Sequence, residues 1–332
     1  MQHRAIQIFR CTKCDGPLVM AAATSGNSST EDVVEGQLAC PENHTSAPIV
    51  RGIPRFVASE SYAANWGFQW NHFDQIQIDS VMANDLSRDR FYKTTGWSSR
   101  MEGQRILEVG CGAGRFTQLA LETGAEVVSF DLSSSVDVAL RNNPGQSRWT
   151  VFQGSIYDIP LRKNSFDKIF CMGVLQFCPD VEGAFRSMLP FLRPGGEIVV
   201  DVYERSKFPP LKTFVRPVTK RMKTESLYKF LSWTIPPAFE VKKAIHQVPA
   251  VGPQLARLIP IGALSHIERG LNYSDSELKQ VKILSALNML SPVFEHPQRM
   301  KDVQRWFADG GLVEVELKRG YNGINAKGRR AS

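Results

Sequence analysis

The chain has 332 residues, of which 42% are hydrophobic and 22% are charged. This composition is typical of a globular protein and excludes wholesale disorder, a collagen-like rod and a coiled-coil rod. No run approaches the roughly 20 apolar residues that cross a bilayer, and Met1 to Arg10 lack the apolar core of an export signal. We therefore expect about two domains in the cytosol, where the six cysteines stay reduced.

The net charge of +7 is concentrated in one part of the chain. Between Glu204 and Gly270 there are twelve lysines and arginines against four acids, whereas the rest has 28 against 29. A local excess of positive charge indicates an anionic partner such as a phosphate group, a nucleic acid or a membrane surface. A plain solvated helical face explains the pattern equally well.

The N-terminal part of the chain contains two motifs that can hold a metal. Cys11 and Cys14 form a CxxC pair, and Cys40 is followed by His44. Three thiolates and one imidazole make a closed tetrahedral set of the kind that structural zinc uses. A metal-free remnant, or a site that uses His3, remains an alternative.

The middle of the chain alternates short apolar runs with helical patterns. Strands separated by helices predict a parallel sheet with helices on both faces, in which ligands bind at the carboxyl ends of the strands. We expect strands at 105–109, 126–130, 149–153, 166–172 and 196–203, and helices over 116–123 and 181–192.

Two further regions differ in composition from this alternating part. The segment before it is rich in aromatic residues, and the segment after it has apolar residues at helical spacing with basic residues between them. The second pattern suits helices packed on the core with a cationic outer side, or helices on a membrane surface. The expected units are 1–57, 58–103, 104–203 together with 299–332, and 204–298.

A glycine-rich loop follows the first strand of the alternating part. The sequence EVGCGAGR ends at Arg115, where the dinucleotide pattern GxGxxG would need glycine. Glycines at this place let the backbone turn and approach a ligand closely. Asp131 ends the next strand, where a carboxylate can accept hydrogen bonds from both hydroxyls of a ribose, although a helix cap is an alternative role.

Five segments resemble, in order and spacing, the motifs of class I S-adenosylmethionine (SAM) methyltransferases. The resemblance implies a Rossmann-like α/β fold with a seven-stranded sheet, closed by the helix and hairpin of 299–327, and an enzyme that uses SAM. The segments are ILEVGCGAGRFT at 106–117, VVSFDLS at 127–133, QGSIYDIP at 153–160, SFDKIFCMGVLQF at 165–177 and MLPFLRPGGEIVV at 188–200.

The resemblance assigns contacts to the methionine and ribose parts of SAM. Gly110, Gly112 and Gly114 would border these parts of the cofactor. Glu108 would contact the methionine end, and Asp131 would hold the ribose hydroxyls.

It also assigns the adenine and sulfonium contacts. Leu132 and Ile156 would pack on the adenine ring, and Ser155 stands where the family usually has an aspartate for the adenine amino group. Met172 and Gly173 would lie beside the sulfonium.

Methyl transfer to oxygen or nitrogen requires that the acceptor lose a proton. Many small-molecule relatives have His-His after the fourth strand, where this chain has Gln176-Phe177, which cannot act as a base. Tyr203, at the end of the fifth strand, and His296, just before the closing helix, are the candidate catalytic residues. A structural role for either side chain is an alternative.

Two aromatic-containing segments resemble parts of methyltransferases that carry an N-terminal zinc ribbon. The segment at 47–56 is similar to the end of a short ribbon domain, and a Trp-Gly-x-Gln-Trp segment of such proteins precedes the SAM domain. By this resemblance Trp66, Gln69 and Trp70, together with Gln176, are expected to be walls of the acceptor pocket.

The expected function is a SAM-dependent methyltransferase with a structural zinc ion that acts on a small-molecule or lipid-linked acceptor, with the methylated atom open. An RNA methyltransferase is the alternative, because zinc ribbons also precede rRNA guanine methyltransferases and basic residues fit a phosphate backbone. A non-catalytic SAM-binding protein is the second alternative. The expected location is the cytoplasm, and residues 204–270 are the expected contact if the protein touches a membrane or a nucleic acid.

Overall fold

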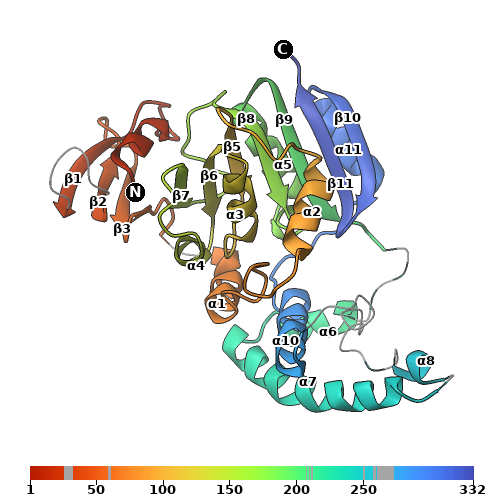
Figure 1. The fold of residues 1–332 in the computed structure, drawn as a ribbon. Coiled ribbons are helices and arrows are strands. Elements are labelled where there is room, and N and C mark those ends of the chain that lie inside the picture. Colours follow the sequence, from red (N-terminus) through yellow and green to blue (C-terminus); the bar gives the residue numbers. More distant parts are fainter. Residues whose placement is uncertain are drawn as a thin grey trace.

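The computed structural model describes the chain except residues 26–32, 59–60, 207, 209, 211, 250, 257–258 and 260–272. A small sheet at the N-terminal end stands beside a larger central sheet, and a group of helices lies below the carboxyl ends of the central strands (Figure 1). No helix among the described residues is both long enough and apolar enough to cross a membrane.

The central sheet has seven strands in the order β10-β11-β9-β8-β5-β6-β7. The first five in the chain run parallel, whereas β11 is antiparallel to both of its neighbours. This topology confirms the expected Rossmann-like fold. The bounds are β5 (Arg105–Val109), β6 (Glu126–Asp131), β7 (Trp149–Gln153), β8 (Phe166–Met172), β9 (Leu192–Tyr203), β10 (Leu312–Gly320) and β11 (Gly323–Arg330).

Helices cover both faces of this sheet, which explains why its strands are apolar at successive positions. Ile106 and Leu107 of β5 enter opposite hydrophobic clusters, because neighbouring side chains of a strand point to opposite faces. One face carries α2 (Leu86–Thr95), α3 (Arg115–Glu122) and α4 (Ser135–Asn142), and the other carries α5 (Val181–Met188) and α11 (Met300–Asp309).

The helix expected over 181–192 is shorter in the structure. It ends at Met188 and continues as the 3-10 turn η4 (Leu189–Phe191), after which β9 begins. Pro190 lies in that turn and has no backbone N–H to continue the α-helical pattern. A second 3-10 turn, η3 (Leu175–Phe177), follows β8.

The N-terminal unit, here called the ribbon (residues 1–57), contains an antiparallel sheet in the order β1-β2-β3-β4. It packs beside β7 through the rings of Phe9, Phe56 and Phe152, whose centroids lie 5.4–5.8 Å apart. Its elements are η1 (His3–Ile8), β1 (Val19–Ser25), β2 (Glu35–Ala39), β3 (Ser46–Val50) and β4 (Ile53–Pro54).

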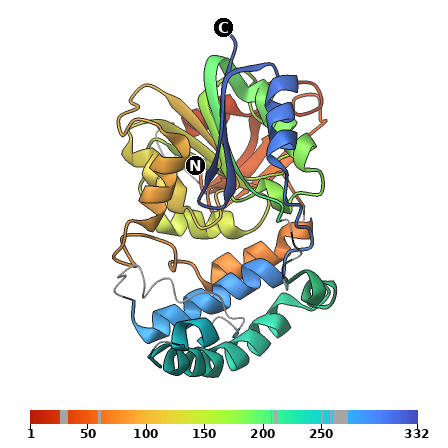
Figure 2. The same cartoon turned by 90° about the vertical axis from the view of Figure 1, so that its right-hand side faces the viewer.

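The helical group below the sheet, here called the lid, comes from the segment 204–298. Two elements of the aromatic segment, η2 (Ser61–Ala63) and α1 (Ala64–His72), lie between the lid and the core (Figures 1 and 2). Phe73 packs there in one cluster with Leu227, Leu231 and Leu287 of the lid. The lid helices are α6 (Lys212–Thr219), α7 (Thr224–His246), α8 (Gly252–Ala256) and α10 (Asp275–Leu290).

Candidate active site

A cavity of about 370 Å³ lies at the carboxyl ends of the central strands. Its walls come from the glycine loop, the ends of β6, β8 and β9, and helices α1, α2 and α10. The turn between β10 and β11 contributes Tyr321 and Asn322. The core, the aromatic segment and the lid therefore share one cavity.

The glycine loop needs its glycines for both conformation and space. Gly110, Gly112 and Gly114 have φ values of +79°, +53° and +86°, a region that side chains disfavour. A Cβ on Gly110 would lie 2.3 Å from Val174, and one on Gly112 would lie 3.2 Å from the indole nitrogen of Trp70. Of the three, Gly110 and Gly112 line the cavity, whereas Gly114 is the N-cap of α3 behind it.

Asp131 lines the cavity at the end of β6. One carboxylate oxygen accepts a hydrogen bond from the backbone of Gly112, and the other accepts from the backbone and hydroxyl of Ser133. Burial raises the pKa of Asp131 above its ordinary value, although these bonds favour the ionised form. The oxygen bonded to Gly112 accepts one hydrogen bond and keeps a lone pair that can accept from a ribose hydroxyl, whereas the other oxygen already accepts two.

Glu108 does not reach the cavity, which differs from the expected contact with methionine. Its side chain is buried, and one oxygen accepts hydrogen bonds from the hydroxyls of Thr117 and Ser129. It therefore ties β5, α3 and β6 together beneath the glycine loop. Burial raises the pKa of Glu108 to about 7.

The expected adenine side of the cavity is formed by Leu132 and Ile156, with Gly154 between them. Ser155 is not among the lining residues, so its expected contact with the cofactor is not seen in this geometry. Its hydroxyl instead accepts a hydrogen bond from the backbone of Tyr157. Met172 and Gly173 line the cavity at the end of β8, as the resemblance implies.

Aromatic rings form the wall that faces the lid. Trp66 and Trp70 of α1 line the cavity, as expected of the acceptor pocket. The ring of Trp66 lies 4.7 Å from that of Phe177, which in turn lies 5.5 Å from that of Tyr203. Together these rings make an apolar surface that can hold a flat or hydrocarbon group.

Gln69 and Gln176 do not line the cavity, so the structure corrects both expectations. Gln69 of α1 is buried, and its amide donates to the side chain of Asn288, a lining residue of α10. Gln176 is also buried, and its amide has no hydrogen-bond partner in the described part of the chain. Both glutamines lie behind the cavity wall.

Of the two candidate catalytic residues, only Tyr203 lines the cavity. Burial, followed by the nearby negative charge of Glu295, raises the pKa of Tyr203 to about 12. The phenol therefore keeps its proton at neutral pH and can donate a hydrogen bond. His296 is exposed outside the cavity, where its ring stacks with Phe294, so the structure does not bring it to the site.

Three charged residues at the site escape the sequence analysis. Arg90 of α2 pairs with Asp201 of β9 at 2.6 Å, and both side chains are buried. Asp201 also accepts from the backbone of Gly173. A signal for this pair is the acidic residue inside the apolar run at the end of β9, because a buried carboxylate requires a partner.

Arg115 follows the glycine loop and lines the same cavity. Within the described chain its side chain makes no hydrogen bond or ion pair, and its guanidinium lies 4.4 Å from the ring centre of Phe116. Burial and the neighbouring positive charge of Arg90 lower the pKa of Arg115 to about 9. The guanidinium therefore remains charged at neutral pH and can receive an anionic group.

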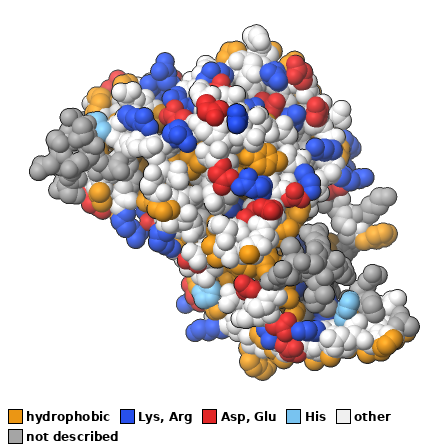
Figure 3. All heavy atoms as spheres, viewed as in Figure 1, with side chains coloured by type: hydrophobic (Ala, Val, Ile, Leu, Met, Phe, Trp, Pro, Cys, Tyr) orange, Lys and Arg blue, Asp and Glu red, His pale blue; other side chains and the backbone are white. Residues whose placement is uncertain are grey.

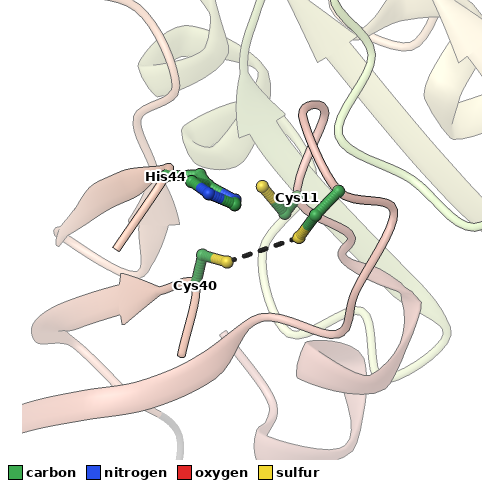
Figure 4. A group of neighbouring side chains, drawn as sticks. Cys11, Cys40 and His44 are labelled. Atoms are coloured by element: carbon green, nitrogen blue, oxygen red, sulfur yellow. Dashed lines mark hydrogen bonds between the residues drawn. The ribbon is translucent and has the colours of Figure 1, made fainter. Parts of the chain in front are cut away.

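The four expected metal ligands converge in the ribbon (Figure 4). The sulfur atoms of Cys11, Cys14 and Cys40 and a ring nitrogen of His44 all lie within 4.8 Å of one another. The sulfurs of Cys14 and Cys40 are 3.6 Å apart, close to the spacing that tetrahedral bonds of about 2.3 Å require. The donor set and its geometry fit a closed zinc site.

The central part of the chain is similar to known proteins. Residues 107–200 match the family model described as "Methyltransferase domain". The chain is similar to malonyl-[acyl-carrier protein] O-methyltransferase of Serratia marcescens, with 32% identity over 115 residues, which are 34% of this chain and 44% of that protein. It is also similar to ubiquinone biosynthesis O-methyltransferase of Xanthomonas euvesicatoria pv. vesicatoria, with 31% identity over 114 residues, 33% of this chain and 48% of that protein.

A sterol 24-C-methyltransferase of Pneumocystis carinii is 28% identical over 145 residues, 42% of this chain and 38% of that protein. The matches thus span less than half the length of each of these relatives. A crystal structure of human N-acetylserotonin methyltransferase with SAM aligns with 82% of this chain and 57% of its own chain, at 14% identity and a TM-score of 0.44. Residues 107–200 of this chain are therefore a methyltransferase domain of the class I SAM-dependent type.

Proposed function

We propose that the protein transfers the methyl group of SAM to a small-molecule or lipid-linked acceptor. The observation that carries this proposal is the single cavity that joins the glycine loop and Asp131 to the aromatic wall of Trp66, Phe177 and Tyr203. SAM fits the glycine-loop side by the chemistry of its ribose and methionine. The aromatic side is left for an acceptor.

The cavity suits methyl transfer by alignment and exclusion of water. The sulfonium of SAM is itself a good electrophile, so the chain mainly has to orient it toward the acceptor in a dry site. No histidine lines the described cavity, and the phenols of Tyr62 and Tyr203 keep their protons because burial raises their pKa. An acceptor that is already ionised, or whose proton passes to water, suits this site.

The similar proteins support an acceptor of this kind. They are named for transfer to malonyl-[acyl-carrier protein], for ubiquinone biosynthesis and for sterol methylation, so both oxygen and carbon acceptors occur among them.

The basic residues of the lid do not favour RNA as the acceptor. In the described part of 204–270, no lysine or arginine lines the cavity. Lys212 and Arg216 are instead paired with Glu295, and Lys243 is paired with Asp275. An RNA acceptor would have to be held by cations that lie away from the aromatic wall.

For the ribbon we propose a structural zinc ion held by Cys11, Cys14, Cys40 and His44. When bound, such an ion cross-links the two halves of the ribbon and takes no part in methyl transfer. The turns beside the ligands support this role, because Asp15, directly after Cys14, and Asn43, directly before His44, adopt left-handed φ values of 60° and 58°.

Calorimetry with S-adenosylhomocysteine, the demethylated product of SAM, tests the cofactor side. We expect Asp131→Asn to weaken binding by about tenfold to a hundredfold, because hydrogen bonds to a charged group are lost. Asp85→Asn, which changes an exposed carboxylate outside the cavity, is the control. Equal affinity of both variants would contradict the assignment, and binding without any methyl transfer in a cell extract would favour the non-catalytic alternative.

A further inference from the structure

The outer face of the lid exposes large apolar side chains. Trp233 of α7 is 76% exposed, and Phe214 and Val218 of α6 are 70% and 66% exposed. Phe230 and Val241 of α7 are also more than half exposed. These five residues are here called the apolar stripe. Single exposed apolar residues need no explanation, but a group of this size on two consecutive helices that both pack on α10 indicates a contact surface.

The stripe follows from the two-sided pattern of α7. Residues 227, 231, 235 and 239 are buried and face the rest of the lid. Phe230, Trp233 and Val241 lie on the other side of the helix, at intervals of three and eight residues. The helix therefore has an apolar inner face and a second apolar face toward solvent.

Positive side chains stand at the turn between α6 and α7 and in the first two turns of α7. They are Lys220, Arg221, Lys223 and Lys229, here called the basic turn, and all four are exposed. No ion pair links any of them to an acid of the described chain, whereas Lys212 and Arg216 are paired. Figure 3 shows hydrophobic and basic side chains, with some acidic ones among them, along the lower edge of the molecule, where the lid lies.

We propose that this face of the lid docks on an anionic membrane surface. Exposed Trp and Phe side chains on a helix, combined with lysine and arginine, are the signature of helices that lie in the interface of a bilayer. The apolar stripe would enter the region between headgroups and acyl chains, and the basic turn would contact the negative headgroups.

Other binding partners would suit only one of the two features, the apolar stripe or the basic turn. An RNA backbone neutralises the basic turn but leaves the aliphatic members of the stripe in water. A symmetric contact with a second copy covers the stripe but brings a second basic turn into the same interface. An anionic bilayer surface satisfies both features.

The docked face lies one helix layer from the proposed active site. α7 packs against α10, and Ser285 and Asn288 of α10 line the cavity. Docking would therefore bring a lipid-linked acceptor close to the cavity wall. This consequence rests on the proposed function, whereas docking itself does not.

Sedimentation with vesicles tests the proposal in the absence of SAM, so its result is independent of methyl transfer. The full-length protein is mixed with vesicles of phosphatidylcholine alone or with added phosphatidylglycerol. We expect binding at least about tenfold stronger to the anionic vesicles, and loss of this preference at high salt.

Two sets of variants separate the contributions of the surface. Phe230→Ser with Trp233→Ser removes apolar contact, and conversion of the four basic-turn residues to Gln removes charge. Each set should weaken binding at least about fivefold. Val313→Ser and Lys301→Gln with Lys318→Gln, which change exposed residues elsewhere, should leave it unchanged.

The thermal unfolding midpoint of each variant confirms that it is folded. Absence of vesicle binding by the unaltered protein would overturn the proposal, as would equal binding of all variants. Dimerisation in light scattering that disappears with Trp233→Ser, without vesicle binding, would instead assign the stripe to a second copy. Binding to single-stranded RNA but not to vesicles would assign the basic turn to nucleic acid.

Discussion

The ribbon and the lid both extend the methyltransferase core, but they are joined to it differently. The ribbon is tied by backbone hydrogen bonds to the end of β7, from Phe56 to Gln153, and to the segment that follows it, from Arg10 to Pro160. The lid packs around α1 through apolar side chains and keeps an exposed apolar face. In the described chain it is hydrogen-bonded to the core backbone only near its end, from His296 to Gln176 and from Gln298 to Tyr203. The ribbon is therefore bound to the core along its inner side, whereas the lid presents an apolar surface to solvent.

The ribbon and the lid also reach different sides of the cavity. On the ribbon side, Arg55 donates to the side chain of Gln153, which donates in turn to the backbone of Leu132 on the expected adenine side. On the lid side, Asn288 reaches the cavity beside the aromatic wall. We infer that changes in the ribbon affect the cofactor, whereas changes in the lid affect the acceptor.

The largest effect is expected from the buried ion pair of Arg90 and Asp201, which lies in the core at the cavity. Asp201→Asn should destabilise the protein by about 3–5 kcal/mol, because it leaves Arg90 as a buried charge without its partner. Denaturant unfolding measures the change. Arg90→Gln in the same chain should restore part of the lost stability, and a simple sum of the two single effects would contradict a coupled pair.

A pH effect of about 3 kcal/mol is expected from Glu108 in the cofactor-free protein. Its folded pKa of about 7 lies above its ordinary value of 4.5, so the folded state holds the proton more tightly. The resulting stability is fully present below pH 4.5 and is lost as the pH rises to about 7. Glu108→Gln should remove this part of the pH dependence of unfolding, and parallel curves for both proteins would refute it.

Loss of the proposed metal should weaken cofactor binding, by a smaller free energy than the two effects on unfolding. We expect chelation, or Cys40→Ser, to reduce the affinity for S-adenosylhomocysteine about fivefold to tenfold through the Arg55–Gln153 contact. Metal content is measured alongside binding, and addition of zinc to the chelated protein is the control. An unchanged affinity in metal-free protein would break the proposed link between the ribbon and the cofactor.

The smallest effect is expected on the outer face of the lid. Phe230→Ser with Trp233→Ser should change the unfolding free energy by no more than about 0.5 kcal/mol per site and leave cofactor affinity unaltered. Both side chains are mostly in water in the free protein. A strong loss of cofactor affinity would show that the lid, too, controls the cofactor end.

Local patterns explain how much of the cofactor side the sequence can predict. The glycine loop and Asp131 are readable because a strand, a turn and a helix in short succession fix where the backbone goes. The cluster of Cys11, Cys14, Cys40 and His44 is readable because metal ligands need particular side chains at short spacings. In the structure, the glycine loop and Asp131 line one cavity, and the four metal ligands form a separate cluster in the ribbon.

The acceptor side depends on contacts that short patterns do not contain. Arg90 and Asp201 meet across 111 residues of sequence. Gln69 and Trp70 are neighbours on α1, yet only Trp70 lines the cavity, whereas the amide of Gln69 is hydrogen-bonded to Asn288 of α10, which is distant in the sequence. The sequence predicts that α1 borders the pocket but not which of its side chains does so.

The most direct test of the central claim is to incubate the purified protein with methyl-labelled SAM and a fractionated extract of its own cells. The proposed function predicts label in low-mass or organic-soluble material, and its loss with Asp131→Asn but not with Asp85→Asn. Label in a ribonuclease-sensitive fraction would contradict the proposed acceptor and identify the protein as an RNA methyltransferase.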